Sequence, residues 1–508
     1  MKNILFFFIA ALLANNSFAQ FGQQEPNKNP LLNADYWEKK PTVATVQATI
    51  AEGNSPTDKT RSNFDVVYTG ILNGASLDVV KYLVEQNHID VNTQGHEKLT
   101  YVHAAASRGN VDVLNYLLTK GAKLDVETDF GMTPIVMAVS RAQSNPDIYE
   151  AFFKKGVNPK AKYTGGANLL LLGISGDKDL KLTTYLISQG LSLKDTDNYG
   201  KTAFDYAAKS GNIELLKTLD AKGVKHTGNA LFMAAGGGGR RMGKPVSVEV
   251  FKYLVDDLKI APNANDKEGQ IILHPLVKQE GQDEAINYFL GKGLDINQTD
   301  KEGNTVFMAA TGTKNVQLIT ALLPKVKNIN AINMAGESAL SNAVKGGSVE
   351  TIELLVKSGA DIKVRDKKGQ NLAYVLISSH RAGRGGFNRG GANDDTAEKL
   401  QLLKSKGLNI VELPEDHNSL YHIAASKSDL VALKALENLG LDINAKNNEG
   451  ATALHKAALV SKNDQTLQYL VSSGADKTIK DEMGETAYDL AKENEYLRKA
   501  NVSVEFLK

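Results

Sequence analysis

The chain has 508 residues and a nearly balanced charge, with 59 lysines and arginines against 58 aspartates and glutamates. Its hydrophobic content of 42% is that of a folded protein rather than a disordered chain. The sequence lacks the repeated apolar runs of about 20 residues that a multi-span membrane protein requires. Because it contains no cysteine, disulfide frameworks, cysteine-ligated zinc, iron–sulfur clusters and cysteine nucleophiles are excluded.

Residues 1–19 have the layout of a secretory signal peptide. Lys2 lies in a short basic start, an apolar run covers 4–14, and the small residues Ser17 and Ala19 occupy the −3 and −1 positions of a cleavage site. A buried N-terminal helix is the alternative. We predict cleavage before Gln20 and export, to the periplasm in the first place and to the extracellular space in the second. Loss of Lys2 leaves 58 charges of each sign, and this neutrality argues against attraction of the whole chain to nucleic acid or anionic lipid.

A polar, proline-punctuated segment over 20–30 is predicted to be flexible, and a repeated unit follows it. The glycine that precedes each short apolar helix recurs at Gly269, Gly303, Gly336 and Gly369, spaced by 34, 33 and 33 residues. An alanine-rich first helix follows the glycine, and 452–458 (TALHKAA) is the clearest copy. A second, amphipathic helix follows at a fixed offset, as in 349–360 (VETIELLVKSGA), and ends at a glycine. Asp/Asn-rich turns separate the units.

A period near 33 residues combined with a Thr-x-Leu-His-x-Ala-Ala signature resembles the ankyrin repeat. The resemblance implies an all-α solenoid of about 13–14 helix–turn–helix units with short hairpin fingers, covering 31–508. A degenerate first unit is expected over 31–60 and a C-terminal cap over 484–508. Pro275 is expected to shorten its helix, and the unit beginning near Gly165 lacks the motif's Thr and His, so its first helix departs furthest from the pattern.

Four of the nine histidines occupy the same repeat position. They are His103, His274, His422 and His455. The resemblance implies that this histidine forms hydrogen bonds that join neighbouring units. The other five show neither the i,i+4 spacing of a helical zinc site nor a clustered carboxylate partner in the sequence; they are His88, His96, His226, His380 and His417. We therefore expect no metal, no cofactor and no enzymatic activity.

Two Gly/Arg-rich insertions interrupt the period, at 236–245 and 380–395. Both fall between the two helices of a unit. Their partner-binding candidates are Arg240, Arg241, Arg384, Phe387 and Arg389, and Lys244 and Arg381 add to the positive charge. Three interpretations stay open: a tolerated insertion, a partner-binding loop, or an Arg-Gly-Gly-type contact to nucleic acid. One copy of that motif in a neutral chain makes nucleic acid the least favoured of them.

The resemblance also implies that the concave face, built from fingers and first helices, binds proteins. Large side chains beside the finger glycines are the candidates for partner contact, although some could fold back on a neighbouring finger. They are Phe130, Met132, Tyr163, Tyr199, Lys201, Lys267, Met334, Lys367, Lys368 and Met483. We expect an exported, monomeric, non-catalytic scaffold that binds a protein partner. The alternatives are a secreted effector that binds a host or competitor protein, and an accessory subunit of an envelope enzyme.

Overall fold

The computed structural model describes residues 27–86, 89–237, 245–380 and 394–508. The predicted signal peptide lies outside these ranges, as do most of segment 20–30 and most of both insertions. The candidates Arg240, Arg241, Arg384, Phe387 and Arg389, together with Lys244 and Arg381, are therefore outside the described residues. The chain divides into two units, 1–192 and 193–508.

Helices α1 to α28 form fourteen consecutive pairs, which confirms the predicted all-helical repeat. In the first unit the elements are η1 (Pro30–Leu32), α1 (Ala34–Glu38), α2 (Val43–Ala51), α3 (Val66–Leu72), α4 (Leu77–Gln86), η2 (His96–Lys98), α5 (Tyr101–Arg108), α6 (Val111–Thr119), α7 (Pro134–Ser140), α8 (Pro146–Lys154), η3 (Thr164–Gly166), α9 (Leu169–Gly173) and α10 (Lys181–Ser188). Within the described ranges there are isolated β-bridges but no longer strands.

The second unit continues the same alternation of first and second helices. Its elements are α11 (Ala203–Ala208), α12 (Ile213–Ala221), α13 (Asn229–Ala235), α14 (Val248–Lys252), the π-helical η4 (Tyr253–Asp257), α15 (Leu273–Leu276), α16 (Asp283–Gly291), α17 (Val306–Thr311), α18 (Val316–Leu322), η5 (Leu323–Lys325), α19 (Ala339–Gly346), α20 (Val349–Lys357), α21 (Leu372–Ser379), α22 (Thr396–Ser405), α23 (Leu420–Ser426), α24 (Leu430–Ala435), α25 (Ala453–Val460), α26 (Gln465–Ser472), α27 (Ala487–Glu493), α28 (Glu495–Lys499) and η6 (Glu505–Leu507). Helix α15 has only four residues, as expected from Pro275.

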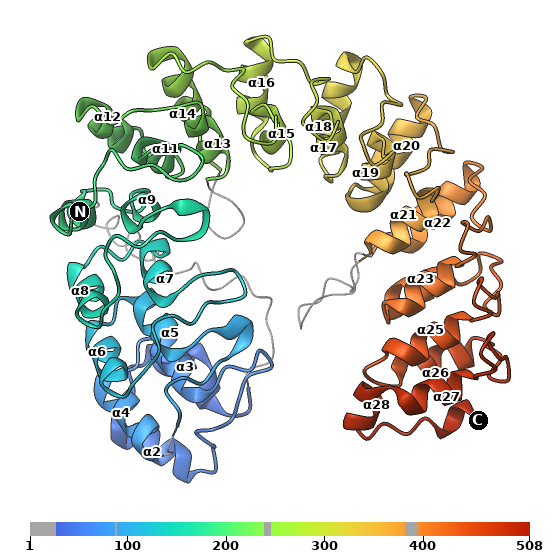
Figure 1. The fold of residues 1–508 in the computed structure, drawn as a ribbon, viewed down its shortest axis with the longest axis horizontal. Helices are drawn as coiled ribbons and strands as arrows, with labels where there is room; N and C mark the ends of the chain where they lie inside the picture. Colours follow the sequence, from blue (N-terminus) through green and yellow to red (C-terminus); the bar gives the residue numbers. More distant parts are fainter. Residues whose placement is uncertain (1–26, 87–88, 238–244, 381–393) are drawn as a thin grey trace, which may run out of the picture. The chain divides into compact units, whose positions relative to one another are not determined.

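Within each unit the helices are arranged in two rows. First helices contact the next first helix, as in α3–α5–α7–α9 and α17–α19–α21–α23–α25–α27, and second helices contact the next second helix. Figure 1 shows this alternation along the second unit. Small buried side chains such as Ala339 and Ala453 allow the first helices to approach closely. No helix of the described residues is long and apolar enough to cross a membrane.

The described ends of the repeat array are closed by buried apolar side chains. At the start, Trp37 is fully buried and its indole N–H donates to the carbonyl of Leu31 at 2.9 Å. A side chain at Gly70 would approach the Trp37 ring to 3.2 Å, so this glycine makes room for the tryptophan. At the other end, Leu497 and Leu507 are buried against the last helices. These contacts cover apolar surface that an open repeat stack would otherwise expose to water.

Candidate protein-binding face

The fingers are hairpins held by short internal hydrogen bonds. In the finger of Asp266, the carboxylate accepts from the backbone N–H groups of Glu268 and Gln270, each at 2.9 Å. Gly269 adopts φ +76°, a left-handed conformation that favours glycine. An isolated bridge between Asn265 and Ile271 closes the hairpin. The two residues before the glycine therefore lie at the tip of this finger.

Backbone hydrogen bonds connect consecutive fingers of the second unit. The N–H of Lys301 donates to the carbonyl of Glu268 at 2.9 Å, and Met334 N–H donates to the Glu302 carbonyl at 2.8 Å. The N–H of Lys367 then donates to the carbonyl of Ala335 at 2.8 Å. These bonds fix the spacing of the finger tips before any partner arrives.

Most of the predicted contact side chains lie on the surface of the fingers. Phe130 in the first unit has an exposed fraction of 59%; in the second unit the values are 50% for Tyr199, 63% for Met334 and 86% for Met483. The side chains of Lys267, Lys367 and Lys368 are exposed as well. Exposed aromatic and methionine side chains are typical of interface hot spots.

Three other candidates are only partly exposed. Met132, Tyr163 and Lys201 are half-buried. The hydroxyl of Tyr163 is buried without a hydrogen-bond partner, and desolvation by burial raises the pKa of Tyr163 to about 12. The partial burial of these three agrees with the alternative that some of the ten side chains fold back on a neighbouring finger. The repeat pattern shows which residues flank the finger glycine, but not how closely the next finger packs on them.

Tyr199 lies beneath two lysine ammonium groups. The Nζ of Lys201 is 5.6 Å and that of Lys267 is 4.5 Å from the centre of its ring. Lys267 belongs to a finger two repeats further along the chain. The intervening unit has only five residues between Gly223 and α13, too few for a finger. The two flanking fingers therefore meet, and the cations contact the electron-rich face of the ring.

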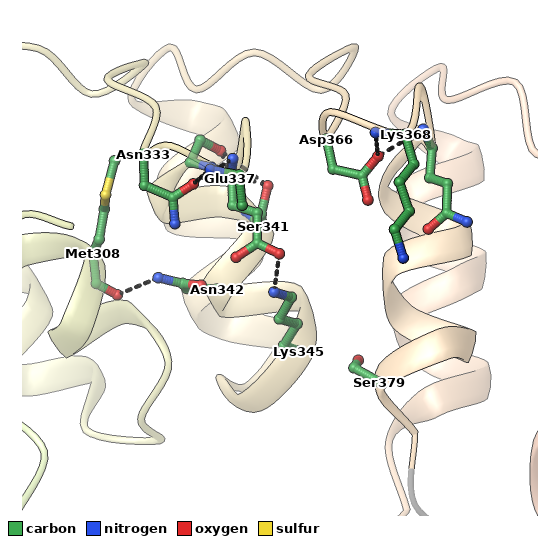
Figure 2. Close-up of polar contacts among 12 residues, drawn as sticks. Met308, Asn333, Glu337, Ser341, Asn342, Lys345, Asp366, Lys368 and Ser379 are labelled. Atoms are coloured by element: carbon green, nitrogen blue, oxygen red, sulfur yellow. Dashed lines mark hydrogen bonds and ion pairs between the residues drawn. The ribbon is translucent and has the colours of Figure 1, made fainter. Parts of the chain in front are cut away.

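A groove of about 530 Å³ lies between the fingers and the first helices of the second unit. Its lining includes Gln270, Asp300, Glu302, Asn304, Asn342 and Lys345. Asn342 donates to the Met308 carbonyl at 2.9 Å. Figure 2 shows this contact and the pairing of Lys345 with Glu337. Asn333 donates to Asn304 at 2.7 Å. The groove therefore presents amides and a paired charge, held in place by neighbouring repeats.

Each of the four repeat-position histidines bonds to the following repeat. The Nε2 atoms of His103, His274, His422 and His455 face the carbonyls of Met132, Asn304, Ala451 and Glu485 at 3.1, 3.1, 2.8 and 3.2 Å. In each case Nδ1 faces the backbone N–H three residues earlier, at the start of the helix. An Nε2 that faces a carbonyl must donate, so Nδ1 accepts and the ring is neutral. Desolvation by burial lowers the pKa of all four imidazoles.

A fifth histidine, His380, has partners that sequence reasoning missed. Its Nδ1 lies 2.5 Å from a carboxylate oxygen of Asp429, and its Nε2 lies 2.8 Å from one of Asp394. The partners are 49 and 14 residues away, so no local spacing reveals them. Within the described ranges, no group of three or more His, Asp or Glu side chains is placed to hold a metal ion.

Comparison with known proteins agrees with this architecture. The family model described as ankyrin repeats (3 copies) matches residues 68–163, 273–366 and 389–481, and a second model, ankyrin repeats (many copies), matches 173–219. The first model alone covers more than half of the chain. The fold and the fingers define a helical repeat protein, and the chain belongs to the ankyrin repeat family.

Individual relatives share limited identity with the chain. Alpha-latrocrustotoxin-Lt1a of Latrodectus tredecimguttatus is 35% identical over 115 residues, which are 23% of this chain and 8% of the toxin. The human transient receptor potential cation channel subfamily A member 1 is 22% identical over 86% of this chain and 36% of the channel. The crystal structure of the human ASB11 ankyrin repeat domain matches 44% of this chain and 94% of that domain, with 20% identity and a TM-score of 0.37. The matched segments thus span a minor part of both of these larger relatives.

Proposed function

We propose that the protein is an exported, non-catalytic scaffold that binds a protein partner through its finger/first-helix face. Ankyrin repeats are protein-binding scaffolds and are typically non-catalytic. The observation that carries the proposal is the exposure of Tyr199, Met334 and Met483 at finger tips. Burying such side chains against a partner releases water from apolar surface and stabilises the complex.

The rigidity of the second unit supports this proposal. Fingers joined by backbone hydrogen bonds lose little conformational entropy on binding, which leaves more of the contact energy for affinity. The exposed Lys267, Lys367 and Lys368 would steer an acidic partner surface toward the same face, with an attraction that weakens as salt is added.

Capture of the partner tests the binding proposal. The chain from Gln20 onward serves as bait in an extract of the cell envelope. A second bait carries Tyr199→Ala, Met334→Ala and Met483→Ala. A third carries Glu353→Ala and Lys434→Ala, which change exposed side chains on the second helices α20 and α24. The partner should be retained by the first and third baits and lost from the second. Equal retention by all three baits would contradict the proposed face.

Export is proposed from residues 1–19 alone and has its own test. Mass spectrometry of the protein from its native cell should find a chain that begins at or near Gln20. Fractionation then separates a periplasmic scaffold from the two alternatives, a released effector and an accessory subunit that co-purifies with an envelope enzyme. Recovery of the chain beginning at Met1 from the cytosol only would remove the export claim and leave the binding proposal intact.

A further inference from the structure

His380 lies where three helices of the second unit meet. It directly follows α21, its Nε2 faces Asp394 just before α22, and its Nδ1 faces Asp429 at the start of α24. The exposed fractions of the three side chains are 12% for His380, 17% for Asp394 and 0% for Asp429. Both carboxylates also accept from a helix N-terminus: Asp429, the N-cap of α24, accepts from Ala432 N–H at 3.0 Å, and Asp394, one residue before the N-cap of α22, accepts from Thr396 N–H at 2.9 Å.

The geometry requires the imidazole to carry two protons. Each ring nitrogen is within hydrogen-bond distance of a carboxylate oxygen, and an ionised carboxylate can only accept. A neutral imidazole has one N–H, so its other nitrogen would present a lone pair to a carboxylate. Only the imidazolium donates to both partners, and these charge-assisted bonds are stronger than neutral ones.

The carboxylates of Asp394 and Asp429 face the ring nitrogens, and the other charged groups nearby have partners of their own. Lys427, which lies between α23 and α24, donates its ammonium protons to the carbonyls of Ile377 and Ser378 at 3.1 Å and also to the carbonyl of His380. Asp395 is engaged on the other side, by Lys399 of α22 at 3.1 Å and by Lys314 at 3.5 Å.

We propose that His380 is a proton-dependent clamp that joins α21, α22 and α24 as an imidazolium and releases Asp394 when it loses a proton. The remaining N–H of the neutral ring continues to donate to Asp429. That carboxylate is fully buried, and leaving a buried charge without a hydrogen bond costs more free energy than leaving the more exposed Asp394 without one. Asp394 is the more exposed of the two and can be hydrated instead. Deprotonation therefore loosens the start of α22, the helix that follows the 380–395 insertion.

The direction of the pH dependence follows from the same contacts. Hydrogen bonds and charge from Asp429 and Asp394 raise the pKa of His380 against the opposing effect of burial, and the pKa values of both aspartates are lowered. The histidine contribution to stability is complete below its unfolded pKa of about 6.5 and is lost as the pH rises through its folded pKa. The carboxylate contribution is lost in acid, as the pH falls through the folded pKa values of the aspartates.

The first test measures the protonation of His380 in the full mature chain. Histidine labelled with ¹³C at Cε1 gives one NMR signal per ring, and the His380 signal is the one that disappears in His380→Gln. We expect its midpoint to lie above about 6.5. In Asp394→Asn, which keeps the shape and the cap acceptor, we expect the midpoint to fall by about one unit or more. A midpoint at or below about 6.5 in the unmodified chain would overturn the proposal.

The second test follows the clamp through hydrogen–deuterium exchange of a peptide covering α22, corrected for the intrinsic pH dependence of exchange. In the unmodified chain, exchange at the start of α22 should rise several-fold as the pH passes the His380 midpoint. In His380→Gln it should be fast at every pH. The control His417→Asn changes an exposed histidine at φ +56°, where asparagine is tolerated, and should behave as the unmodified chain. The same pH response in the unmodified chain and in His380→Gln would show that His380 is not the clamp.

Discussion

At the residue scale, one neutral imidazole joins each of four pairs of neighbouring repeats. His455 is 1% exposed, accepts from the Thr452 N–H and donates to the Glu485 carbonyl. This arrangement satisfies a helix N-terminus and a finger carbonyl with a single ring. Three consecutive repeats have Met308, Ser341 and Tyr374 at the same position, and the Tyr374 hydroxyl is buried without a partner.

Replacing His455 with alanine should therefore destabilise the last repeats. We expect a loss of about 1–3 kcal/mol, because the buried Thr452 N–H and the partly buried Glu485 carbonyl lose their partner. Urea unfolding followed by circular dichroism measures the change, and His417→Asn serves as the exposed control. A midpoint equal to that of the control would show that the hydrogen bond contributes nothing.

The same four histidines set the acid response of the fold. Because burial lowers the pKa of each ring, the unfolded chain binds more protons once the pH falls below about 6.5, and stability falls with it. The contribution of His380 to stability has the opposite pH dependence, because it is lost as the pH rises. We expect the melting temperature to decrease from about pH 7 to pH 5, and to decrease less steeply in His455→Ala. A melting temperature that is constant over this range would contradict the neutral buried rings.

Sequence periodicity could predict these histidines because they recur with the repeat. It could not predict the partners of His380, because Asp429 lies in the following repeat and its approach depends on how the helices pack. Nor could it predict that Tyr163 is half-buried while Tyr199 is exposed, since both flank a finger glycine. Periodicity defines a residue's place in the repeat, whereas burial depends on the neighbouring repeat.

At the element scale, the finger is the structure that positions the candidate site. Its tight turn needs a positive φ, and some consecutive fingers approach so closely that a glycine is also required for space. A Cβ at Gly336 would lie 2.9 Å from the backbone nitrogen of Lys367. A Cβ at Gly369 would have no atom within 4 Å. The two glycines nevertheless have similar φ values, +78° at Gly336 and +73° at Gly369.

This pair of glycines gives a matched test of finger stacking. Both Gly336→Ala and Gly369→Ala place an alanine in a left-handed backbone conformation, which lowers the free energy of unfolding by about 1–2 kcal/mol. Only Gly336→Ala must also displace the next finger, so we expect it to lower stability further and to increase the amide exchange of Lys367. Equal effects of the two substitutions would mean that the finger-to-finger contact is not tight.

Element boundaries were predictable where a residue imposes them directly. Pro275 shortens α15, and glycine ends helices such as α5, where Gly109 has φ +72°. The π-helical turn η4 after α14 and the meeting of Tyr199 with Lys267 were not predictable. No sequence pattern indicates the π-helical turn. The contact between Tyr199 and Lys267 arises because the unit between them lacks a finger, and this contact can be recognised only once the repeats are stacked.

At the scale of the whole molecule, the proposed function places partner contact at many equivalent positions rather than in one site. Apart from the fingers of Tyr199 and Lys267, which meet across one unit, repeats contact mainly their neighbours, so tip residues can vary without disturbing the fold. The chain has a net charge of only +1, so in the proposed function recognition would depend on how side chains are distributed over the fingers rather than on net charge. A partner would contact several finger tips at once, and the few apolar anchors among them would carry most of the affinity.

The affinity for the captured partner tests the proposed face most directly. Isothermal titration calorimetry compares the chain from Gln20 onward, its Tyr199→Ala/Met334→Ala/Met483→Ala variant, and the Glu353→Ala/Lys434→Ala control. Loss of one hot-spot side chain costs about 2 kcal/mol and the costs are not additive, so we expect the dissociation constant of the finger variant to rise by at least about 30-fold and by up to about 10,000-fold if all three contribute fully. The control should bind as the unmodified chain does. An unchanged dissociation constant in the finger variant, with weakened binding in the control, would place recognition on the second helices and contradict the proposed face.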